Sequence, residues 1–302
     1  MSELRFDDRV AVITGAGRGL GRAYALLLAS RGARVLVNDL GASLKGEGVD
    51  TGPAQEVVTE IRAAGGAAAA CTESVATPAG GRAIIDAALD HFGRIDILIH
   101  NAGAVRRAPL AEMTYEVFEF ILDVHLRGAF HVMRPAFPLM CKARYGRIVL
   151  TSSVNGLYGN YKNANYSAAK AGAIGLSNVA ALEGAEHNVK SNVIIPAAVT
   201  RMSEGIDTSA FPPMPPEMVA PAVGWLAHES CPITGKMLIS AAGRVAMAYV
   251  AETRGMYRPQ WSIEDMETYR DAIGDSAAST VFATVPSGQL DHLRYSFAMT
   301  KS

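Results

Sequence analysis

The sequence predicts an α/β protein with a Rossmann-type, doubly wound parallel sheet of seven strands and a small C-terminal helical extension. Two observations support this. Short apolar runs alternate with amphipathic stretches of helical length along most of the 302 residues, which is typical of a parallel sheet covered on both faces. A glycine-rich turn also separates the first apolar run from the first helix, as in dinucleotide-binding folds.

The first strand, turn and helix form the first half of a dinucleotide-binding unit. Residues 10–14 are an apolar run, residues 15–21 read Gly-Ala-Gly-Arg-Gly-Leu-Gly, and the helix that follows stops at Gly32. Glycines allow the backbone to approach a pyrophosphate, and a helix N-terminus offers free N–H groups and a partial positive charge. We therefore expect a nucleotide cofactor at this turn.

The end of the second strand, residues 34–39, favours NAD as that cofactor. Asp39 can accept hydrogen bonds from both ribose hydroxyls of the adenosine half, and it would repel the 2′-phosphate of NADP. Arg18 argues for NADP, because a guanidinium in the turn can pair with that phosphate. A carboxylate facing the phosphate costs more than one exposed arginine returns, so we predict NAD and interpret Arg18 as a solvated loop residue.

The remaining elements continue the alternation. After a long glycine-rich connection over 40–52, we expect helices at 54–64, 78–91, 113–143 and 166–186, and strands at 67–73, 95–100, 147–151, 189–195 and 236–240. Pro135 and Pro138 should bend or interrupt the long helix, and Pro196 should end the sixth strand. A loop over 200–216 follows, and its apolar residues are candidates for a substrate pocket: Ile206, Phe211 and Met214.

Tyr166 and Lys170 are the candidate acid/base pair. They stand four residues apart on a predicted helix, so their side chains leave the same face. A lysine ammonium close to a phenol favours the phenolate and lowers its pKa from about 10 toward neutral pH. The spacing alone is also that of a solvated helix face, and it becomes informative because the preceding strand ends close to Ser153, at the sheet edge where ligands bind.

The combination of motifs resembles the short-chain dehydrogenase/reductase family. The matching positions span residues 6–243 and read Thr14-Gly15-x-x-x-Gly19-x-Gly21, Asn101-Ala102-Gly103, Ser153 and Tyr166-x-x-x-Lys170. Within that family the chain is similar to the (3R)-hydroxyacyl-CoA dehydrogenase part of peroxisomal multifunctional enzyme type 2, also called 17β-hydroxysteroid dehydrogenase type 4, and its bacterial relatives. The stretches that carry this similarity include Val37-Asn38-Asp39-Leu40-Gly41 and Val124-His125-Leu126-Arg127-Gly128.

The resemblance implies a role for each candidate catalytic residue. Tyr166 is the acid/base at the substrate oxygen, Lys170 lowers its pKa and holds the nicotinamide ribose, and Ser153 hydrogen-bonds the substrate oxygen. His125 stands where the family usually has a fourth catalytic residue, an asparagine, and the subgroup also has histidine there. For His125, proton relay and helix packing both remain open.

The resemblance also implies the NAD contacts. These are Gly15, Arg18, Gly19, Leu20 and Gly21 at the pyrophosphate, Asp39 at the adenosine ribose, Ser74 and Val75 at the adenine, Asn101, Ala102 and Gly103 in the centre, and Tyr166, Lys170, Pro196, Val199 and Thr200 at the nicotinamide. Two positions depart from the family pattern. Ser74 replaces a common adenine-binding aspartate, and the segment 196–200 lacks the glycine that usually follows the proline.

These features imply an NAD-dependent oxidoreductase that interconverts a secondary alcohol and a ketone, most simply (3R)-hydroxyacyl-CoA and 3-ketoacyl-CoA. The alternative is a dehydrogenase of steroid hydroxyls or steroid-side-chain CoA thioesters. A non-catalytic NAD-binding scaffold is a third reading, which the intact serine, tyrosine and lysine argue against. The resemblance further implies a dehydrogenase domain over 1–243, an extension over 244–302 that covers the active site or a subunit interface, and a homodimer or homotetramer.

Composition narrows the partners and the compartment. The net charge is −1 and hydrophobic residues make up 49%, so nothing favours a nucleic-acid or membrane partner. Cys71, Cys141 and Cys231 match no metal or disulfide spacing, so we expect reduced thiols and no metal. We find no apolar run typical of a signal peptide or membrane span, and residues 300–302 are not a peroxisomal address. We therefore expect a cytoplasmic enzyme.

Overall fold

The protein is organised around one eight-stranded sheet. The computed structural model describes residues 3–203, 207 and 209–301, so Ile206 of the predicted substrate loop lies outside the described residues. The strand order is β3-β2-β1-β4-β5-β6-β7-β8. All neighbours are parallel except the last pair, β7 and β8. The chain reverses its direction of sheet growth between β1 and β4, which creates a switch point at their carboxyl ends.

Strands and helices alternate as expected through β6. The strands are β1 (Val10–Thr14), β2 (Arg34–Asn38), β3 (Ala67–Cys71), β4 (Ile97–His100), β5 (Gly146–Thr151), β6 (Val189–Ala197), β7 (Met237–Ala241) and β8 (Arg244–Ala248). The helices are α1 (Gly19–Ser30), α2 (Gly52–Ala63), α3 (Pro78–Phe92), α4 (Tyr115–Leu122), α5 (Gly128–Ala143), α6 (Val154–Tyr158), α7 (Ala164–Gly184), α8 (Ala220–Ala227), α9 (Ile263–Thr268), α10 (Arg270–Ile273) and α11 (Gln289–Ala298). The short helix α6 was not predicted.

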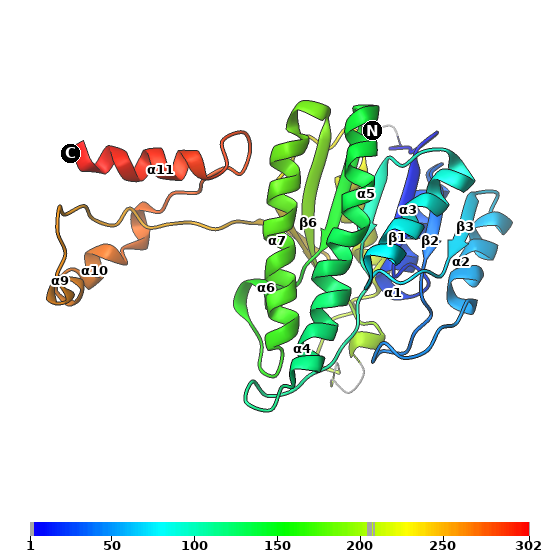
Figure 1. The fold of residues 1–302 in the computed structure, drawn as a ribbon, viewed down its shortest axis with the longest axis horizontal. Coiled ribbons are helices and arrows are strands. Elements are labelled where there is room, and N and C mark those ends of the chain that lie inside the picture. The colour runs from blue at the N-terminus through cyan, green and yellow to red at the C-terminus, as the bar shows by residue number, and fades with distance from the viewer. Residues whose placement is uncertain (1–2, 204–206, 208, 302) are drawn as a thin grey trace.

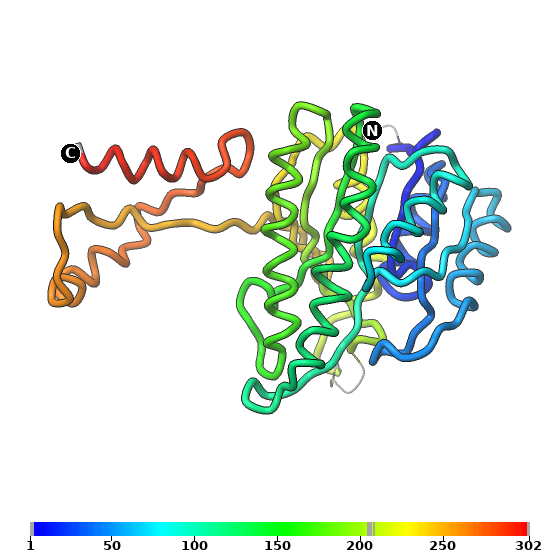
Figure 2. Tube along the Cα trace, in the orientation of Figure 1, coloured from blue at the N-terminus to red at the C-terminus, as the bar shows by residue number. Residues whose placement is uncertain are grey.

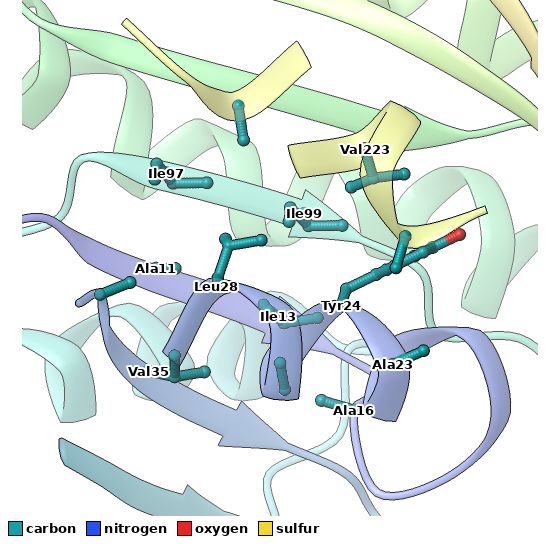
Figure 3. Close-up of a cluster of buried hydrophobic side chains, with 14 of the residues drawn as sticks. Ala11, Ile13, Ala16, Ala23, Tyr24, Leu28, Val35, Ile97, Ile99 and Val223 are labelled. Carbon is teal, nitrogen blue, oxygen red and sulfur yellow. The ribbon is translucent and has the colours of Figure 1, made fainter. Parts of the chain in front are cut away.

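Two hydrophobic cores lie on the two faces of the sheet. Helices α3, α5 and α7 cover one face, and α1, α2 and α8 cover the other (Figure 1). Figure 3 shows the second core, in which Leu28 of α1 lies among Ile13 of β1, Ile99 of β4 and Val223 of α8. Because β1 and β4 are buried on both faces, their residues are apolar without alternation up to the last position of each strand, where Thr14 and His100 are polar.

The prediction of seven strands is corrected to eight. Seven strands are parallel as expected, and β8 is an antiparallel edge strand from the segment that was assigned to the extension. Ala241 pairs with Arg244, so a two-residue turn of Ala242 and Gly243 joins β7 to β8. Both turn residues have positive φ, +47° and +80°, as a tight hairpin between right-twisted strands requires. An alanine at such a position is unusual, which is why the sequence did not reveal the hairpin.

The predicted long helix over 113–143 is formed, but it is interrupted elsewhere than expected. Helix α5 runs through both Pro135 and Pro138, so the prediction of an interruption there is wrong. Its buried face packs against α3 and the sheet, and this burial outweighs the hydrogen bond that each proline removes. The irregular part is instead a π-helical turn at Asp123–Arg127, which joins α4 to α5. Pro196 likewise does not end its strand, because β6 continues to Ala197.

The segment after β8 projects away from the sheet. Figures 1 and 2 show α9, α10 and α11 to one side of α7, joined to the sheet by an extended stretch of chain. Thr284 Oγ1 donates to Gly235 O at 3.3 Å, and Gly288 lies against Leu182 near the C-terminal end of α7. Several apolar side chains of this tail are exposed, among them Tyr249, Val250, Ile263, Met266, Leu290 and Phe297.

Three further features of the described residues concern disulfide pairing, metal binding and membrane crossing. Cys71, Cys141 and Cys231 are unpaired thiols, and Cys141 alone is half-buried rather than buried. Within the described ranges, no group of three or more His, Cys, Asp or Glu residues is arranged to hold a metal ion. No described helix has the length and apolar character needed to cross a membrane.

We predict that Leu28→Ala lowers the free energy of unfolding by about 2–5 kcal/mol, because it leaves a cavity in the core of Figure 3. Chemical denaturation measures the change. Leu110→Ala is the matched control: Leu110 is 79% exposed, so its truncation should change stability by less than about 0.5 kcal/mol. Equal losses in the two variants would contradict the assignment of this core.

Candidate active site

A cavity of about 240 Å³ opens at the carboxyl ends of β1, β2 and β4. Most of the predicted cofactor residues line it: Gly15, Arg18, Gly19, Leu20, Asp39, Ser74, Val75, Asn101, Ala102, Gly103 and Thr200. Five do not: Gly21, Tyr166, Lys170, Pro196 and Val199. The switch point of the sheet therefore gathers residues that are distant in sequence into one concave surface, as expected from their positions after the strands.

The glycine turn forms one wall of the cavity through backbone contacts that a side chain would block. Gly15 and Gly19 have φ of +64° and +52°, a region that favours glycine. A Cβ on Gly21 would overlap the carbonyl oxygen of Gly15, so Gly21 supports the turn from behind the cavity wall. Helix α1 starts at Gly19 and presents its N-terminal N–H groups there. This is a cradle suited to a pyrophosphate.

Asp39 connects the glycine turn to the loop that follows β2. Its Oδ2 accepts from Gly17 N and its Oδ1 from Gly41 N, both at 2.8 Å. Each carboxylate oxygen keeps a lone pair that can accept from a ribose hydroxyl. Arg18 lines the same cavity and is half-buried, and its interpretation as a solvated loop residue stays a prediction. Arg18 makes no ion pair within the described part of the chain.

Asn101 fixes the end of β4 against the glycine turn. Its Nδ2 donates to Gly15 O at 3.1 Å. Thr14 Oγ1, at the end of β1, accepts from the backbone N–H groups of Asn101 and Ala102, each at 3.1 Å, and lies 3.0 Å from His100 Nδ1. The central wall of the cavity is thus held by bonds between neighbouring strand ends, which explains why a polar Thr14 is buried there.

Ser153, Tyr166 and Lys170 lie beyond the carboxyl end of β5. Ser153 caps α6, and its Oγ accepts from Asn155 N at 3.2 Å. Lys170 is buried; its Nζ donates to Thr151 O at 2.6 Å and lies 5.5 Å from the centroid of the Tyr166 ring. Ser152 Oγ in turn donates to Lys170 O at 2.7 Å. The end of β5 and the start of α7 therefore hold each other in place.

Burial dominates the protonation of this pair. It raises the pKa of Tyr166, and the Ser153 hydroxyl and the charge of Arg107 oppose that rise. Burial also lowers the pKa of Lys170 to about 7. The expectation that the lysine ammonium lowers the phenol pKa is therefore not met in this structure, because desolvation weakens the lysine charge that would do so. The degree of desolvation at the site therefore sets the pKa of both groups.

His125 belongs to the π-helical turn and lies beside Tyr166 of α7. The two rings meet edge to face with centroids 5.1 Å apart, and His125 Nε2 lies 2.9 Å from Ala104 O and 3.1 Å from Ala104 N. Burial, with the nearby Lys170, holds the pKa of His125 well below its usual value, so the ring is neutral. The geometry gives His125 a packing contact with Tyr166, and its catalytic role stays a prediction.

Several cavity residues were not predicted from the sequence. The loop after β2 contributes Leu40, Ala42, Ser43, Leu44 and Gly46, and α4 contributes Phe120. The unusual length of that glycine-rich loop was the available signal, although length alone does not show where a loop folds back. Asn165 was also missed as a site residue: it is fully buried, and its Oδ1 accepts from Tyr166 N at 2.8 Å.

A parallel sheet with this strand order and a glycine cradle at its switch point defines a dinucleotide-binding protein of the Rossmann type. The family comparison is more specific. Residues 9–209, more than half of the chain, match the family described as short chain dehydrogenase. The chain belongs to the short-chain dehydrogenase family.

Individual relatives agree with that assignment. The chain is 47% identical over 268 residues to peroxisomal multifunctional enzyme type 2 of Drosophila melanogaster, covering 88% of this chain and 44% of that protein. The solved full-length structure of that enzyme has a TM-score of 0.82 at 37% identity, covering 99% of this chain and 50% of that one. A 7α-hydroxysteroid dehydrogenase complexed with NADH and 7-oxo glycochenodeoxycholic acid has a TM-score of 0.73 at 28% identity, covering 80% and 98%. The chain thus spans half or less of the length of the multifunctional relative it matches.

We predict that Lys170→Met stabilises the fold at low pH. The folded pKa of about 7 lies below the unfolded value of about 10.4, so the folded chain binds fewer protons between them and wild-type stability rises with pH across that window. The gain from Lys170→Met should therefore be larger at pH 6 than at pH 9, by about 2.5 kcal/mol. Urea unfolding at the two pH values measures it. Lys142→Met, on the exposed side of α5, is the control, and the same pH trend in both variants would contradict the burial argument.

Proposed function

We propose that the chain is an NAD-dependent oxidoreductase that interconverts (3R)-hydroxyacyl-CoA and 3-ketoacyl-CoA. The observation that carries the proposal is that Ser153, Tyr166 and Lys170 lie together near the cavity that the glycine turn and Asp39 line. The proposed substrate follows from the similarity to peroxisomal multifunctional enzyme type 2, which is strong over the part of that protein the chain covers. A non-catalytic scaffold would not need a buried lysine beside a half-buried tyrosine, because burying the amine costs folding free energy.

The chain's own residues supply proton transfer and orientation. NAD, when bound, supplies the hydride acceptor. Tyr166 takes the proton from the substrate hydroxyl or returns it to the ketone, and Ser153 donates a hydrogen bond to the same oxygen as charge develops. The bond from Lys170 Nζ to Thr151 O holds the amine 5.5 Å from the centroid of the Tyr166 ring. Since the pKa of Lys170 is near neutrality, a small change in its solvation changes its charge.

NAD is proposed over NADP on the geometry of Asp39. Its carboxylate is fixed by two backbone N–H groups at the cavity wall and cannot turn away from a 2′-phosphate without losing them. Arg18 lines the same cavity, where it can pair with the pyrophosphate that both cofactors share. A 2′-phosphate would therefore meet a fixed negative charge, whereas a 2′-hydroxyl would meet an acceptor.

We further propose a homodimer or homotetramer in which the extension over 244–302 contributes to a subunit interface. Beyond β8, the segment from residue 249 onward projects from the sheet (Figure 1), and its Ile263 and Phe297 are 86% and 62% exposed. A second subunit packed against this segment would remove these apolar side chains from water, which supports the proposed interface. The reaction is proposed for the cytoplasm, where unpaired cysteines remain reduced, and a peroxisome is the alternative that the names of the relatives suggest.

The alternative substrate is a steroid hydroxyl or a steroid-side-chain CoA thioester. The similarity to a 7α-hydroxysteroid dehydrogenase favours it, as do the exposed apolar residues Val199 and Phe211 around the predicted substrate loop.

We expect the protein to reduce NAD with (3R)-3-hydroxyacyl-CoA thioesters and to turn over the (3S) enantiomers at less than a tenth of that rate. We expect little turnover with NADP. Differences of about tenfold are typical of one misplaced polar contact. Spectrophotometric assays of NADH formation, with hydroxysteroids tested in parallel, decide between the substrates. Turnover of steroids alone would refute the acyl-CoA proposal.

We predict that Tyr166→Phe lowers kcat by at least about a hundredfold, because it removes the proton donor and acceptor at the substrate oxygen. The phenol is not a cavity-lining group, so NADH affinity should change by less than about threefold. Rapid-mixing kinetics and NADH fluorescence titration measure the two effects. Tyr158→Phe, at a ring that is 80% exposed, controls for loss of a phenol elsewhere. Retained turnover in Tyr166→Phe would show that another group carries the proton.

A further inference from the structure

The loop between β2 and α2 forms a compact flap, residues 40–50, here called the capping loop. Its base is pinned by the bond from Asp50 N to Leu40 O at 3.0 Å. Within it, Ser43 N donates to Glu47 O and Gly46 N donates to Ser43 O, both at 2.9 Å. Five of its residues, Leu40, Ala42, Ser43, Leu44 and Gly46, line the cofactor cavity, so the capping loop is one of its walls.

The tip of the capping loop is held by the segment that follows β4. Val105 N donates to Leu44 O at 3.0 Å. Arg106 donates to Lys45 O twice, from Nε at 3.0 Å and from Nη2 at 2.8 Å. These bonds join segments 61 residues apart in sequence, and the arginine supplies two of the three.

Phe120 of α4 completes the attachment. The Arg106 guanidinium lies 3.8 Å above the centroid of the Phe120 ring, a cation–π contact. The edge of the same ring packs against Gly46, where a Cβ would overlap it. Phe120 also lines the cavity. Arg106 makes no ion pair among the residues described, so its charge is satisfied by a carbonyl oxygen and an aromatic face, both on or next to the capping loop.

The backbone of Arg106 reaches the catalytic helix. Its carbonyl oxygen accepts from Asn165 Nδ2 at 3.0 Å, and Asn165 Oδ1 accepts from Tyr166 N at 2.8 Å. Asn165 is fully buried and also donates to Val117 O at 3.3 Å. One residue therefore contacts the capping loop with its side chain and the first turn of α7 with its backbone.

Glycines and solvent-exposed residues give the capping loop the freedom to open. Gly41, Gly46 and Gly48 have φ of +72°, +81° and +81°, and glycine crosses such regions without a Cβ penalty. Lys45, Glu47 and residues 48–50 are exposed. Apart from the pinned base and the contacts of residues 105, 106 and 120, the tip has little to hold it closed, and segments with few buried contacts open most readily.

We propose that the capping loop is a lid over the adenosine side of the cofactor cavity and that Arg106 is the latch that keeps it closed and connects it to Tyr166. This inference rests on the proposed function only in taking a nicotinamide dinucleotide as the ligand. Arg106 is then a positioning residue: it acts on cofactor release through the loop and on the acid/base through Asn165, and it touches neither substrate nor reacting atoms.

The test is the rate of NADH release from the 302-residue chain. In stopped-flow displacement, Arg106→Leu should release NADH about tenfold faster than wild type, since a charge-assisted pair of bonds and a cation–π contact are lost. Arg106→Lys keeps the charge and one donor and should fall between the two. Arg62→Leu is the matched control: Arg62 Nε donates to Ala68 O at 3.0 Å, a bond of the same kind at the amino end of β3, so its NADH release rate should equal that of wild type.

Trypsin cleavage after Lys45 gives a second readout of lid opening. Bound NADH should protect this bond in wild type and in Arg62→Leu, and protect it less in Arg106→Leu. Phe120→Leu, which removes the ring beneath the guanidinium, should also speed release and serves if Arg106→Leu does not fold.

Equal release rates in Arg106→Leu and Arg62→Leu, or an unchanged rate in Phe120→Leu when Arg106→Leu does not fold, would overturn the latch while leaving NAD binding established. A wild-type protein that binds no NADH would overturn both the latch and the proposed function.

Discussion

The burial of Lys170 is the constraint on which the site depends. An amine that has lost its water needs a partner, and the only bond the described structure gives it is the short one to the last carbonyl of β5. That bond links α7 to the sheet. Ser152 Oγ adds a second link because it donates to the backbone carbonyl of the same lysine. Tyr166, one turn earlier on α7, is thereby placed without needing a bond of its own to the sheet.

The cofactor cavity is held together by a different kind of interaction. Its wall consists of backbone from strand ends that side chains cross-link: Asp39 joins the glycine turn to the capping loop, and Asn101 joins β4 to the same turn. Polar side chains satisfied by backbone groups leave little freedom to rearrange. The segment 104–108 connects the cradle to the acid/base pair, and it is where Arg106 and Asn165 act.

The sequence predicted what is encoded locally. Continuous apolar runs marked most of the parallel strands, and the positions directly after them named most of the cavity, because parallel strands end at one edge. Features set by pairs distant in sequence were missed, such as the bond between Arg106 and Lys45. The π-helical turn at 123–127 was also hidden, because the apolar pattern around it is helical and prolines drew attention to residues 135 and 138 instead. The sequence also predicted that Lys170 lowers the pKa of Tyr166. It could not show that desolvation instead raises the pKa of Tyr166 and lowers that of Lys170.

The hairpin of β7 and β8 has a consequence for how the tail is separated from the enzyme. β8 hydrogen-bonds along the full length of β7, from Met237 to Ala241, and so shields the last parallel strand from solvent-exposed pairing. Shortening the chain at Gly243 would remove this strand with the tail and leave a bare row of N–H and C=O groups on β7, a template for self-association. Shortening it beyond Ala248 would remove the arm and keep the sheet edge covered.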